Sequence, residues 1–271
     1  MAPLVVRVRA PVLPSSSWEA AVPPRTPYGL FVDELIDVSP GNLRALWLPK
    51  DGDHLTTISP IPGGRLWTYS ATANGRKTAS GHGLLITFNG TTEQITTPQT
   101  ADVVFGNGTV DSPFSVVALA NVTNTAAVRE IIGITDSLDG PFHYRFAITA
   151  TDALSLQLLT ASGLATVSRD SDAAATQGSV RLFGASYSGV GGASAADGIT
   201  LYEDGAVKAS TATNNALYVA MQSFEADFNM RVSDATQGPF SGSVGFVALY
   251  AGLLTLAQHA AVKAASNRYH G

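Results

Sequence analysis

Short runs of alternating apolar and polar residues, separated by Gly, Asn, Asp and Ser, begin near residue 80 and continue to residue 250. Alternation with a period of two is typical of strands that bury one face, and this spacing of turn residues is typical of antiparallel sandwiches and barrels. The pattern predicts strands at 84–88, 114–122, 143–149, 154–160, 179–187, 199–203, 206–210, 228–233 and 243–250. We therefore expect an all-β body.

One turn in this body has a specific signature. Asp204-Gly205 separates the runs ITLYE and AVKAS. This dipeptide readily adopts the two positive φ angles that a two-residue hairpin turn requires. The sequence therefore predicts a β-hairpin here.

The period changes to that of a helix over residues 255–269. Thr255 and Gln258 have the spacing of a capping box, and cationic residues lie toward the C-terminal end, where the helix dipole favours them. We expect a short C-terminal helix. Its apolar face is formed by Leu256, Ala260 and Ala264.

The stretch 235–262 carries no Asp, Glu, Lys or Arg and is long enough for a membrane span. It also contains proline, several glycines and polar residues, and its periodicity changes halfway. We interpret it as a buried strand followed by an amphipathic helix, and we expect no membrane span.

Proline is concentrated at the N-terminal end, where ten of the 14 prolines fall within the first 62 residues. Proline cannot donate to a strand ladder and biases its predecessor toward extended conformations. We therefore divide the chain into an extended, proline-rich arm or attachment segment, 1–75, and a body, 76–271. The arm contains a short piece of structure at 32–39 and all three tryptophans, so we expect it to dock, either on its own body or on a neighbouring molecule.

Composition narrows the range of functions. Only 14% of the residues are charged, the net charge is -5 and there is no cysteine. An acidic chain with four lysines makes nucleic acid an unlikely partner, and cysteine chemistry is excluded. Prolines and arginines interrupt the first apolar run, so we expect no signal peptide, and we interpret the N-x-T strings at Asn89, Asn107 and Asn121 as accidental.

Four phrases occur in the order in which they occur in the concanavalin A-like, laminin G-like jelly roll. They are LLITFNGTTEQITTP (84–98), SPFSVVALANV (112–122), GITLYEDGAVKAS (198–210) and FSGSVGFVALYAGLLTLAQHAAVKAASNRY (240–269). Over about residues 80–271 the chain resembles this family, in particular the versions found in structural proteins of tailed bacteriophages. With the arm and the helix, we expect an antiparallel two-sheet jelly-roll sandwich with a proline-rich N-terminal arm and a short C-terminal helix.

Some proteins with this superfold are glucanases, in which an E-x-D-x-x-E strand presents the catalytic carboxylates. The nearest string here is Glu225-Ala-Asp227-Phe-Asn229-Met230, which lacks the second glutamate. We therefore interpret its two carboxylates as solvated, assign no catalytic residue and expect no enzyme. SYSG (186–189) and VGG (190–192) match neither a nucleophile elbow nor a phosphate loop, and we interpret them as a turn.

The remaining candidates are single residues or pairs. Laminin G-like domains sometimes hold calcium, for which the candidates are Asp170 with Asp172 and Asp136 with Asp139. A tyrosine can stack on a sugar, although in sandwiches it more often belongs to the core; the candidates are Tyr187, Tyr202 and Tyr218. The histidines lack a metal-ligand spacing and are interpreted as surface or strand residues; they are His54, His82, His143, His259 and His270. We assign no cofactor, metal or ligand residue.

Two kinds of function remain open. We favour a non-enzymatic virion structural protein of a tailed bacteriophage, made in the host cytoplasm and displayed on the virion surface. A capsid decoration or cement role ranks ahead of a tail-fibre or baseplate role, with the arm binding the major capsid protein or tail components and uncharged surfaces favouring homo-oligomers. The alternative is a lectin-like module that binds host-surface glycans, and a glycoside hydrolase fits least.

Overall fold

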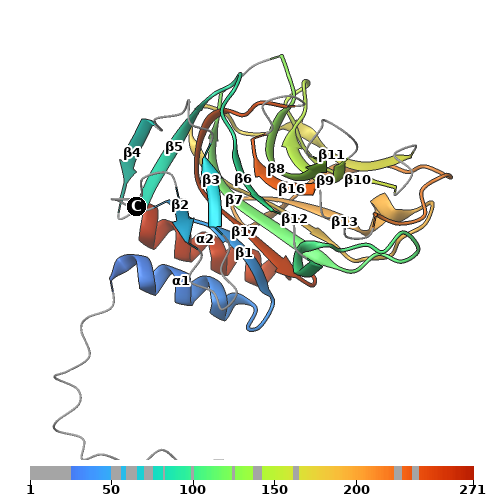
Figure 1. Ribbon diagram of the computed structural model, residues 1–271, viewed down its shortest axis with the longest axis horizontal. Helices are drawn as coiled ribbons and strands as arrows, with labels where there is room; N and C mark the ends of the chain where they lie inside the picture. Colours follow the sequence, from blue (N-terminus) through green and yellow to red (C-terminus); the bar gives the residue numbers. More distant parts are fainter. Residues whose placement is uncertain are drawn as a thin grey trace, which may run out of the picture.

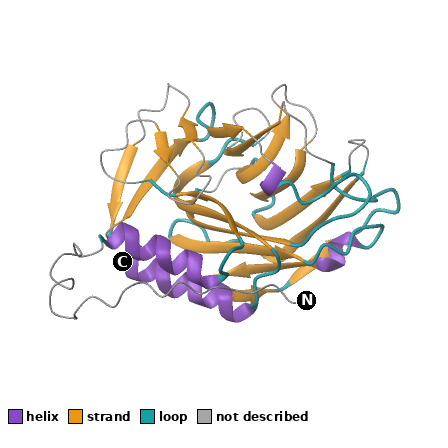
Figure 2. Ribbon diagram, turned by 60° about the horizontal axis from the view of Figure 1, so that its bottom comes forward, coloured by secondary structure: helices purple, strands orange, loops and turns teal. Residues whose placement is uncertain are grey.

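The chain folds into two antiparallel β-sheets, with two helices lying side by side against the outer face of one of them (Figure 1; Figure 2). The computed structural model describes residues 26–49, 56–58, 66–69, 76–81, 83–98, 101–123, 126–136, 142–160, 165–222, 228–233 and 238–271. The predicted all-β, antiparallel two-sheet jelly-roll sandwich with a short C-terminal helix is confirmed.

The first sheet, sheet A, has the strand order β14-β13-β12-β7-β17-β5-β4. Its strands are β1 Leu43–Trp47, β4 Arg76–Ser80, β5 Gly83–Asn89, β7 Phe114–Val122, β12 Val180–Tyr187, β13 Ile199–Glu203, β14 Ala206–Lys208 and β17 Ser241–Ala251. The N-terminal part of β17 pairs with β5 and its C-terminal part with β1, so β1 continues the sheet where β5 ends.

The second sheet, sheet B, has the order β15-β11-β10-β9-β8-β16-β6-β3-β2. Its strands are β2 Thr56–Ile58, β3 Leu66–Tyr69, β6 Ile95–Pro98, β8 Arg129–Asp136, β9 Phe142–Ile148, β10 Ala153–Leu159, β11 Thr166–Ala174, β15 Ser210–Thr213 and β16 Phe228–Val232. Two short 3-10 helices, η1 Ala101–Val103 and η2 Ala195–Gly198, lie in the connections.

Strand β7 shows why the centre of sheet A is apolar at nearly every position. Phe114, Val116 and Ala118 belong to the core between the sheets, whereas Val117 and Leu119 belong to a second core under the helices. A strand that is covered on both faces has no solvent side and needs no polar alternation. Because the helices cover the outer face of β7, its sequence FSVVALANV can be apolar on both faces.

The helical layer consists of α1 Pro27–Val38 and α2 Leu256–His270. Proline occupies the first turn of α1, where its missing N–H costs no helical hydrogen bond. The Phe31 ring of α1 stacks on the Tyr269 ring of α2, with the centroids 4.6 Å apart. The two helices therefore pack on each other as well as on sheet A.

The predicted cap of α2 is confirmed, because Thr255 and Gln258 form both halves of a capping box. The predicted apolar face does not pack, however: Leu256 is 52% exposed, and Ala260 and Ala264 are exposed too. The buried face is formed by His259, Val262, Ala265, Ser266, Tyr269 and His270. The rings of His259, Tyr269 and His270 thus face sheet A. The aliphatic residues Leu256, Ala260 and Ala264, from which the sequence predicted the apolar face, lie on the exposed side of the helix.

The proline-rich range 1–75 contributes to the sandwich. Within it, α1 covers sheet A, β1 pairs with β17, and β2 and β3 extend sheet B. Trp47 is 2% exposed and belongs to the core, whereas Trp18 lies outside the described residues. The sequence left open whether this segment docks on its own body or on a neighbouring molecule. Residues 26–49 pack on the body of their own chain. The described part of this range is not an extended arm, and a boundary after residue 75 stays a prediction.

All nine predicted strands form, with ends that differ by a few residues. The predicted hairpin also forms, with φ angles of 52° at Asp204 and 79° at Gly205. Among the described residues, the strands that the pattern missed are β1, β2, β3, β4, β6, β8, β11 and β15. Several of these are too short to show alternation, and β8 is interrupted by irregular register.

The uncharged stretch 235–262 contains β17 and the first half of α2, as the interpretation of a buried strand followed by a helix required. Within the part of the chain that is described, neither helix is long and apolar enough to cross a membrane.

Candidate functional site

A row of polar residues crosses sheet B at right angles to its strands. The register of six neighbouring strand pairs aligns Thr96, Arg231, Gly133, Arg145, Gln157, Ser168 and Thr213. The residues adjacent to them in sequence, such as Phe146, Leu156 and Val167, belong to the core between the sheets. Because successive side chains in a strand point to opposite faces, this cross-strand row lies on the outer face of sheet B.

Arg145 and Gln157 form the centre of the cross-strand row. Arg145 donates from Nε and Nη2 to Gln157 Oε1, at 3.1 Å and 2.6 Å. Both side chains are half-buried, so the pair is fixed yet open to solvent. Within the described part of the chain, Gln157 Nε2 has no hydrogen-bond partner and can donate to a ligand.

A buried carboxylate lies in the same row. An ideal Cβ at Gly133 would lie 2.8 Å from Glu130 Oε1, so the Glu130 carboxylate fills the place of the missing side chain. Gly133 is registered with Arg231 on one side and Arg145 on the other. A fully buried carboxylate needs cationic or hydrogen-bonding neighbours, and this position sets it between two arginines.

Exposure changes along the cross-strand row. Thr213 at the edge of the sheet is exposed, Gln157 and Arg145 are half-buried, and Arg231 is 5% exposed. His143 lies two residues from Arg145 on β9 and is buried, and burial lowers its pKa to about 4. This histidine is therefore neutral at pH 7. Exposure therefore alternates along the row, because Ser168, between Thr213 and Gln157, is 8% exposed, and Thr96, beyond Arg231, is half-buried.

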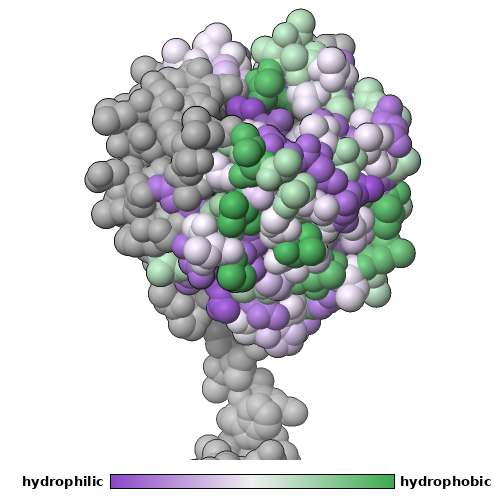
Figure 3. Space-filling view, turned by 90° about the vertical axis from the view of Figure 1, so that its right-hand side faces the viewer, coloured by the Kyte–Doolittle hydropathy of each residue, from purple (hydrophilic) through white to green (hydrophobic). Residues whose placement is uncertain are grey.

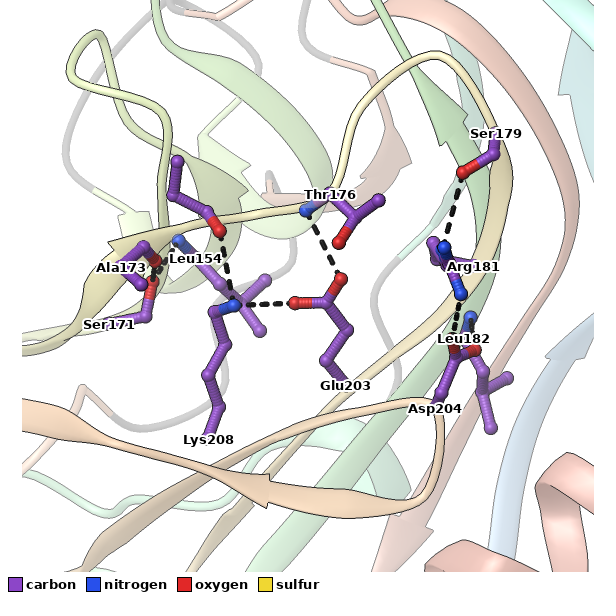
Figure 4. Close-up of polar contacts among 11 residues, drawn as sticks. Leu154, Ser171, Ala173, Thr176, Ser179, Arg181, Leu182, Glu203, Asp204 and Lys208 are labelled. Atoms are coloured by element: carbon purple, nitrogen blue, oxygen red, sulfur yellow. Dashed lines mark hydrogen bonds and ion pairs between the residues drawn. The ribbon is translucent and has the colours of Figure 1, made fainter.

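A second polar cluster surrounds the β13–β14 hairpin (Figure 4). Lys208 Nζ lies 2.6 Å from Glu203 Oε2, and the Thr176 N–H donates to Glu203 Oε1. Burial alone would raise the pKa of Glu203, but the hydrogen bonds from Lys208 and Thr176 hold it below its ordinary value. Asp204 pairs in turn with Arg181 at 2.7 Å. Because these charges satisfy one another, we interpret the cluster as a brace of the hairpin.

A third cluster is buried at one end of the sandwich. Asp111 Oδ2 accepts hydrogen bonds from the Tyr187 and Tyr218 hydroxyls, at 2.7 Å and 2.9 Å. Asp111 Oδ1 accepts from the Met221 N–H at 2.7 Å. Burial raises the pKa of Asp111, although all three hydrogen bonds act in the opposite direction. The two tyrosines are core residues that hold loops together, which confirms the core interpretation over sugar stacking.

Several exposed apolar side chains gather around this buried cluster. Together they are named the apolar end: Val110, Val190, Leu217 and Val219, which are 61%, 60%, 72% and 54% exposed. The Gly192 N–H donates to Val219 O, which joins two of these loops. Figure 3 faces this end of the molecule and shows hydrophobic groups scattered among polar ones. In this view polar groups separate the hydrophobic ones, so they form no continuous hydrophobic surface.

The residues selected from the sequence are spread over the molecule. Glu225 and Asp227 lie outside the described residues, whereas Asn229 belongs to β16. Asp170 accepts from Ser168 Oγ, and Asp172 accepts from Thr211 Oγ1. Of the second calcium pair, Asp136 ends β8 and Asp139 is outside the described residues; Tyr202 is buried against His259. In the described ranges, His, Asp and Glu side chains form no group of three or more that could hold a metal ion.

Among the described histidines, the interpretation as surface or strand residues is confirmed for His143 on β9 and is wrong for His259 and His270. His259 and His270 are buried in α2, and His54 and His82 are outside the described residues. The sequence analysis did not predict the cross-strand row. Alternation in HYRFAIT and LSLQLLT places Arg145 and Gln157 on outer faces, yet nothing local shows that these two strands are neighbours.

Comparisons with known proteins show the fold. No family model and no curated protein matches the chain. Among solved structures, a Trypanosoma rangeli sialidase superposes with a TM-score of 0.53 at 10% identity over 86% of this chain and 34% of that chain. A mutant of that sialidase with trans-sialidase activity gives 0.54 at 12% identity over 90% and 38%. The chain thus spans only about a third of the sialidases.

A smaller domain is similar at a lower score. The carbohydrate-binding module CBM40 of the Ruminococcus gnavus IT-sialidase, bound to alpha2,3 sialyllactose, gives a TM-score of 0.43 at 16% identity over 58% of this chain and 84% of that chain. At such identities the two sialidase superpositions, with TM-scores above 0.5, show the fold alone and leave function to the residues of this chain.

Proposed function

We propose that this protein is a non-catalytic, lectin-like module that binds a carbohydrate along the cross-strand row. The observation that carries the proposal is the row itself, with the Arg145–Gln157 pair at its half-open centre. Sugar hydroxyls both donate and accept hydrogen bonds, so a site for them needs fixed donors and acceptors close together. Guanidinium, amide and hydroxyl groups on neighbouring strands, about 4.8 Å apart, meet that need.

The chemistry of the row favours binding over catalysis. Its carboxylate, Glu130, is fully buried, whereas most glycoside hydrolases use two carboxyl groups that both reach the sugar. Low overall charge fits a ligand recognised mainly through hydroxyls, because the surface provides little long-range attraction for a polyanion. The site therefore holds a glycan without cleaving it.

The test is a glycan array that carries bacterial surface polysaccharides, probed with the full chain and three variants. Arg145→Ala and Gln157→Ala should each reduce binding at least tenfold, because each removes half of a fixed pair. Arg44→Ala is the matched control: Arg44 is also half-buried and hydrogen-bonded to a carbonyl, but it lies on β1 of sheet A. Absence of binding to every glycan, or equal losses in all three variants, would refute the proposal.

A role in a bacteriophage virion is the second candidate, and the apolar end favours it. We propose that another virion protein or a second copy of the chain covers these four separate Val and Leu side chains. On this proposal the protein is a capsid decoration or cement protein, or a tail component, and the glycan site faces outward. Deleting residues 1–25 leaves α1 and both sheets complete, so loss of incorporation into particles would identify that segment as the attachment.

A further inference from the structure

Helix α2 packs on sheet A through a histidine near each end of the helix. His259 lies in its first turn and has no exposed surface, and His270 is its last residue and is 6% exposed. A buried position on an amphipathic helix is normally apolar, because an ionisable ring must stay neutral there or lose its hydration. The packing of α2 on sheet A therefore requires both histidine rings to be neutral.

The His259 ring is enclosed by β12 and β13. It stacks on the Tyr202 ring at 3.7 Å between centroids, and its Nε2 lies 2.9 Å from Ser186 Oγ. Gly184 leaves room for it, since a Cβ there would come within 2.9 Å of the ring. Within the described part of the chain, the other ring nitrogen, Nδ1, has no hydrogen-bond partner. A proton added at Nδ1 would be buried without an acceptor.

The His270 ring lies where α1, α2 and sheet A meet. The Phe31 ring of α1 meets it edge-on at 5.8 Å, and the Phe246 ring of β17 lies parallel to it at 6.0 Å. A Cβ at Gly83 would come within 2.3 Å of the ring, so β5 fits closely against it. Neither ring nitrogen has a hydrogen-bond partner among the described residues. An imidazolium at this place would be buried without an acceptor there, although the C-terminal end of α2 favours a cation.

The charged groups around these rings are already paired or absent. Next to His259, the Asp204 carboxylate pairs with Lys263 at 2.6 Å and also with Arg181. Burial raises the pKa of Asp204, but the hydrogen bonds to this carboxylate hold the pKa below its ordinary value. Next to His270, Glu34 of α1 binds Arg268 at 2.9 Å.

The other elements packed on these rings add little that could compensate a proton. β5 and β17 contain no charged residue. The remaining ionisable residues of α1 and β4 are Tyr28, Asp33, Asp37, Arg76 and Lys77. The aspartates lie on α1, which itself leaves when the layer opens, so their attraction cannot hold the layer to the sheet.

We propose that α1 and α2 form an acid-released layer, which leaves sheet A when His259 and His270 become protonated while the two sheets stay folded. The core between the sheets is formed by their inner faces, whereas the rings of His259 and His270 pack on the outer side of sheet A. Release uncovers the outer face of sheet A, where Val117, Leu119 and Phe246 now lie under the helices.

The pH range follows from burial. Burial lowers the pKa of both histidines from about 6.5 to about 4. Groups whose pKa is lowered by docking favour the docked layer fully above pH 6.5, and this preference is lost as the pH falls toward 4. Between pH 7.5 and pH 4.5 the ratio of released to docked layer should rise about 70-fold for each histidine, or about 5,000-fold for the pair.

Hydrogen exchange read by mass spectrometry at pH 7.5, 6.0 and 4.5, corrected for intrinsic rates, tests the proposal. Peptides from α1 and α2 should lose protection in acid, whereas peptides from β7 and β12 keep it. The double variant His259→Phe with His270→Phe should keep the layer docked at pH 4.5. His143→Phe replaces a buried histidine on the other sheet and is the matched control: its α1 and α2 peptides should lose protection at the same pH as those of the wild type.

Loss of protection in sheets and helices in one step, or no loss above pH 4, would overturn the proposal. So would a double variant that releases the layer at the same pH as the wild type. If the double variant does not fold, the ring resonances of the wild-type histidines decide by NMR. Two rings that titrate together with the exchange of α1 and α2 support the proposal, and two rings that titrate near pH 6.5 in a docked layer refute it.

Discussion

Replacement of Asp111 tests whether one buried carboxylate holds an end of the sandwich together. Its two oxygens accept three hydrogen bonds, from the Tyr187 hydroxyl, the Tyr218 hydroxyl and the Met221 N–H. Asp111→Ala removes the acceptor and leaves three buried donors. A buried donor without a partner costs about 1–3 kcal/mol, so the largest loss of unfolding free energy is about 9 kcal/mol.

The expected loss is smaller than this limit. The Tyr187 hydroxyl also accepts a hydrogen bond from the Gly191 N–H, and Asp111 lies beside the exposed Val110, so water can enter the space that the carboxylate leaves. We therefore expect Asp111→Ala to lower the unfolding free energy by about 3–5 kcal/mol. Asp111→Asn keeps one carbonyl acceptor but replaces the other oxygen with an NH2 group, which cannot accept a hydrogen bond. This variant should lower the unfolding free energy by about 1–2 kcal/mol.

Urea denaturation at pH 7, followed by tryptophan fluorescence, measures these differences. A double-mutant cycle with Tyr218→Phe isolates the hydrogen bond itself, because the second substitution removes one of the orphaned donors. The double variant should be more stable than the sum of the single effects by about 1 kcal/mol or more. An Asp111→Ala variant within 1 kcal/mol of the wild type, or a cycle with no coupling, would show that the cluster does not hold these loops.

Three further substitutions or conditions test other parts of the fold. Thr255→Ala should lower the unfolding free energy by about 1 kcal/mol, because α2 loses its capping box, and helix exchange rates should rise accordingly. Gly205→Ala should cost about 1–2 kcal/mol in thermal or urea unfolding, since φ is 79° there and the new Cβ would lie 3.0 Å from Ala260 Cα. Burial lowers the pKa of His143 to about 4, so its contribution to stability is complete above pH 6.5 and declines toward pH 4. The wild type should therefore lose stability between pH 7 and pH 5, and His143→Phe should reduce that loss by up to about 2 kcal/mol.

The sequence predicted features that depend on neighbouring residues. The Asp204-Gly205 turn and the Thr255 cap are encoded within four residues, and both form. Period-two alternation likewise located nine strands. Short strands such as β6 were missed because their length is too small to show a period.

Features that depend on distant residues could not be read in this way. Asp111, Tyr187 and Tyr218 are separated by up to 107 positions and share one carboxylate. His270 is unremarkable in the sequence, yet α1, from the other end of the chain, and two strands of sheet A, β5 and β17, enclose its ring. The apolar face of α2 was assigned to the wrong side for the same reason, because the sheet selects the ring-bearing face.

The sequence by itself determined the class of the fold, because the alternation of apolar residues fixes which side of each strand is buried. It also determined the local turns and caps, whose hydrogen bonds join residues only a few positions apart. Only the tertiary structure decided which strands are neighbours, and with them the cross-strand row, the Asp111 cluster and the two buried histidines. The physical reason is that a strand's backbone pairs equally well with any other strand, so the partner is selected by packing of the whole core.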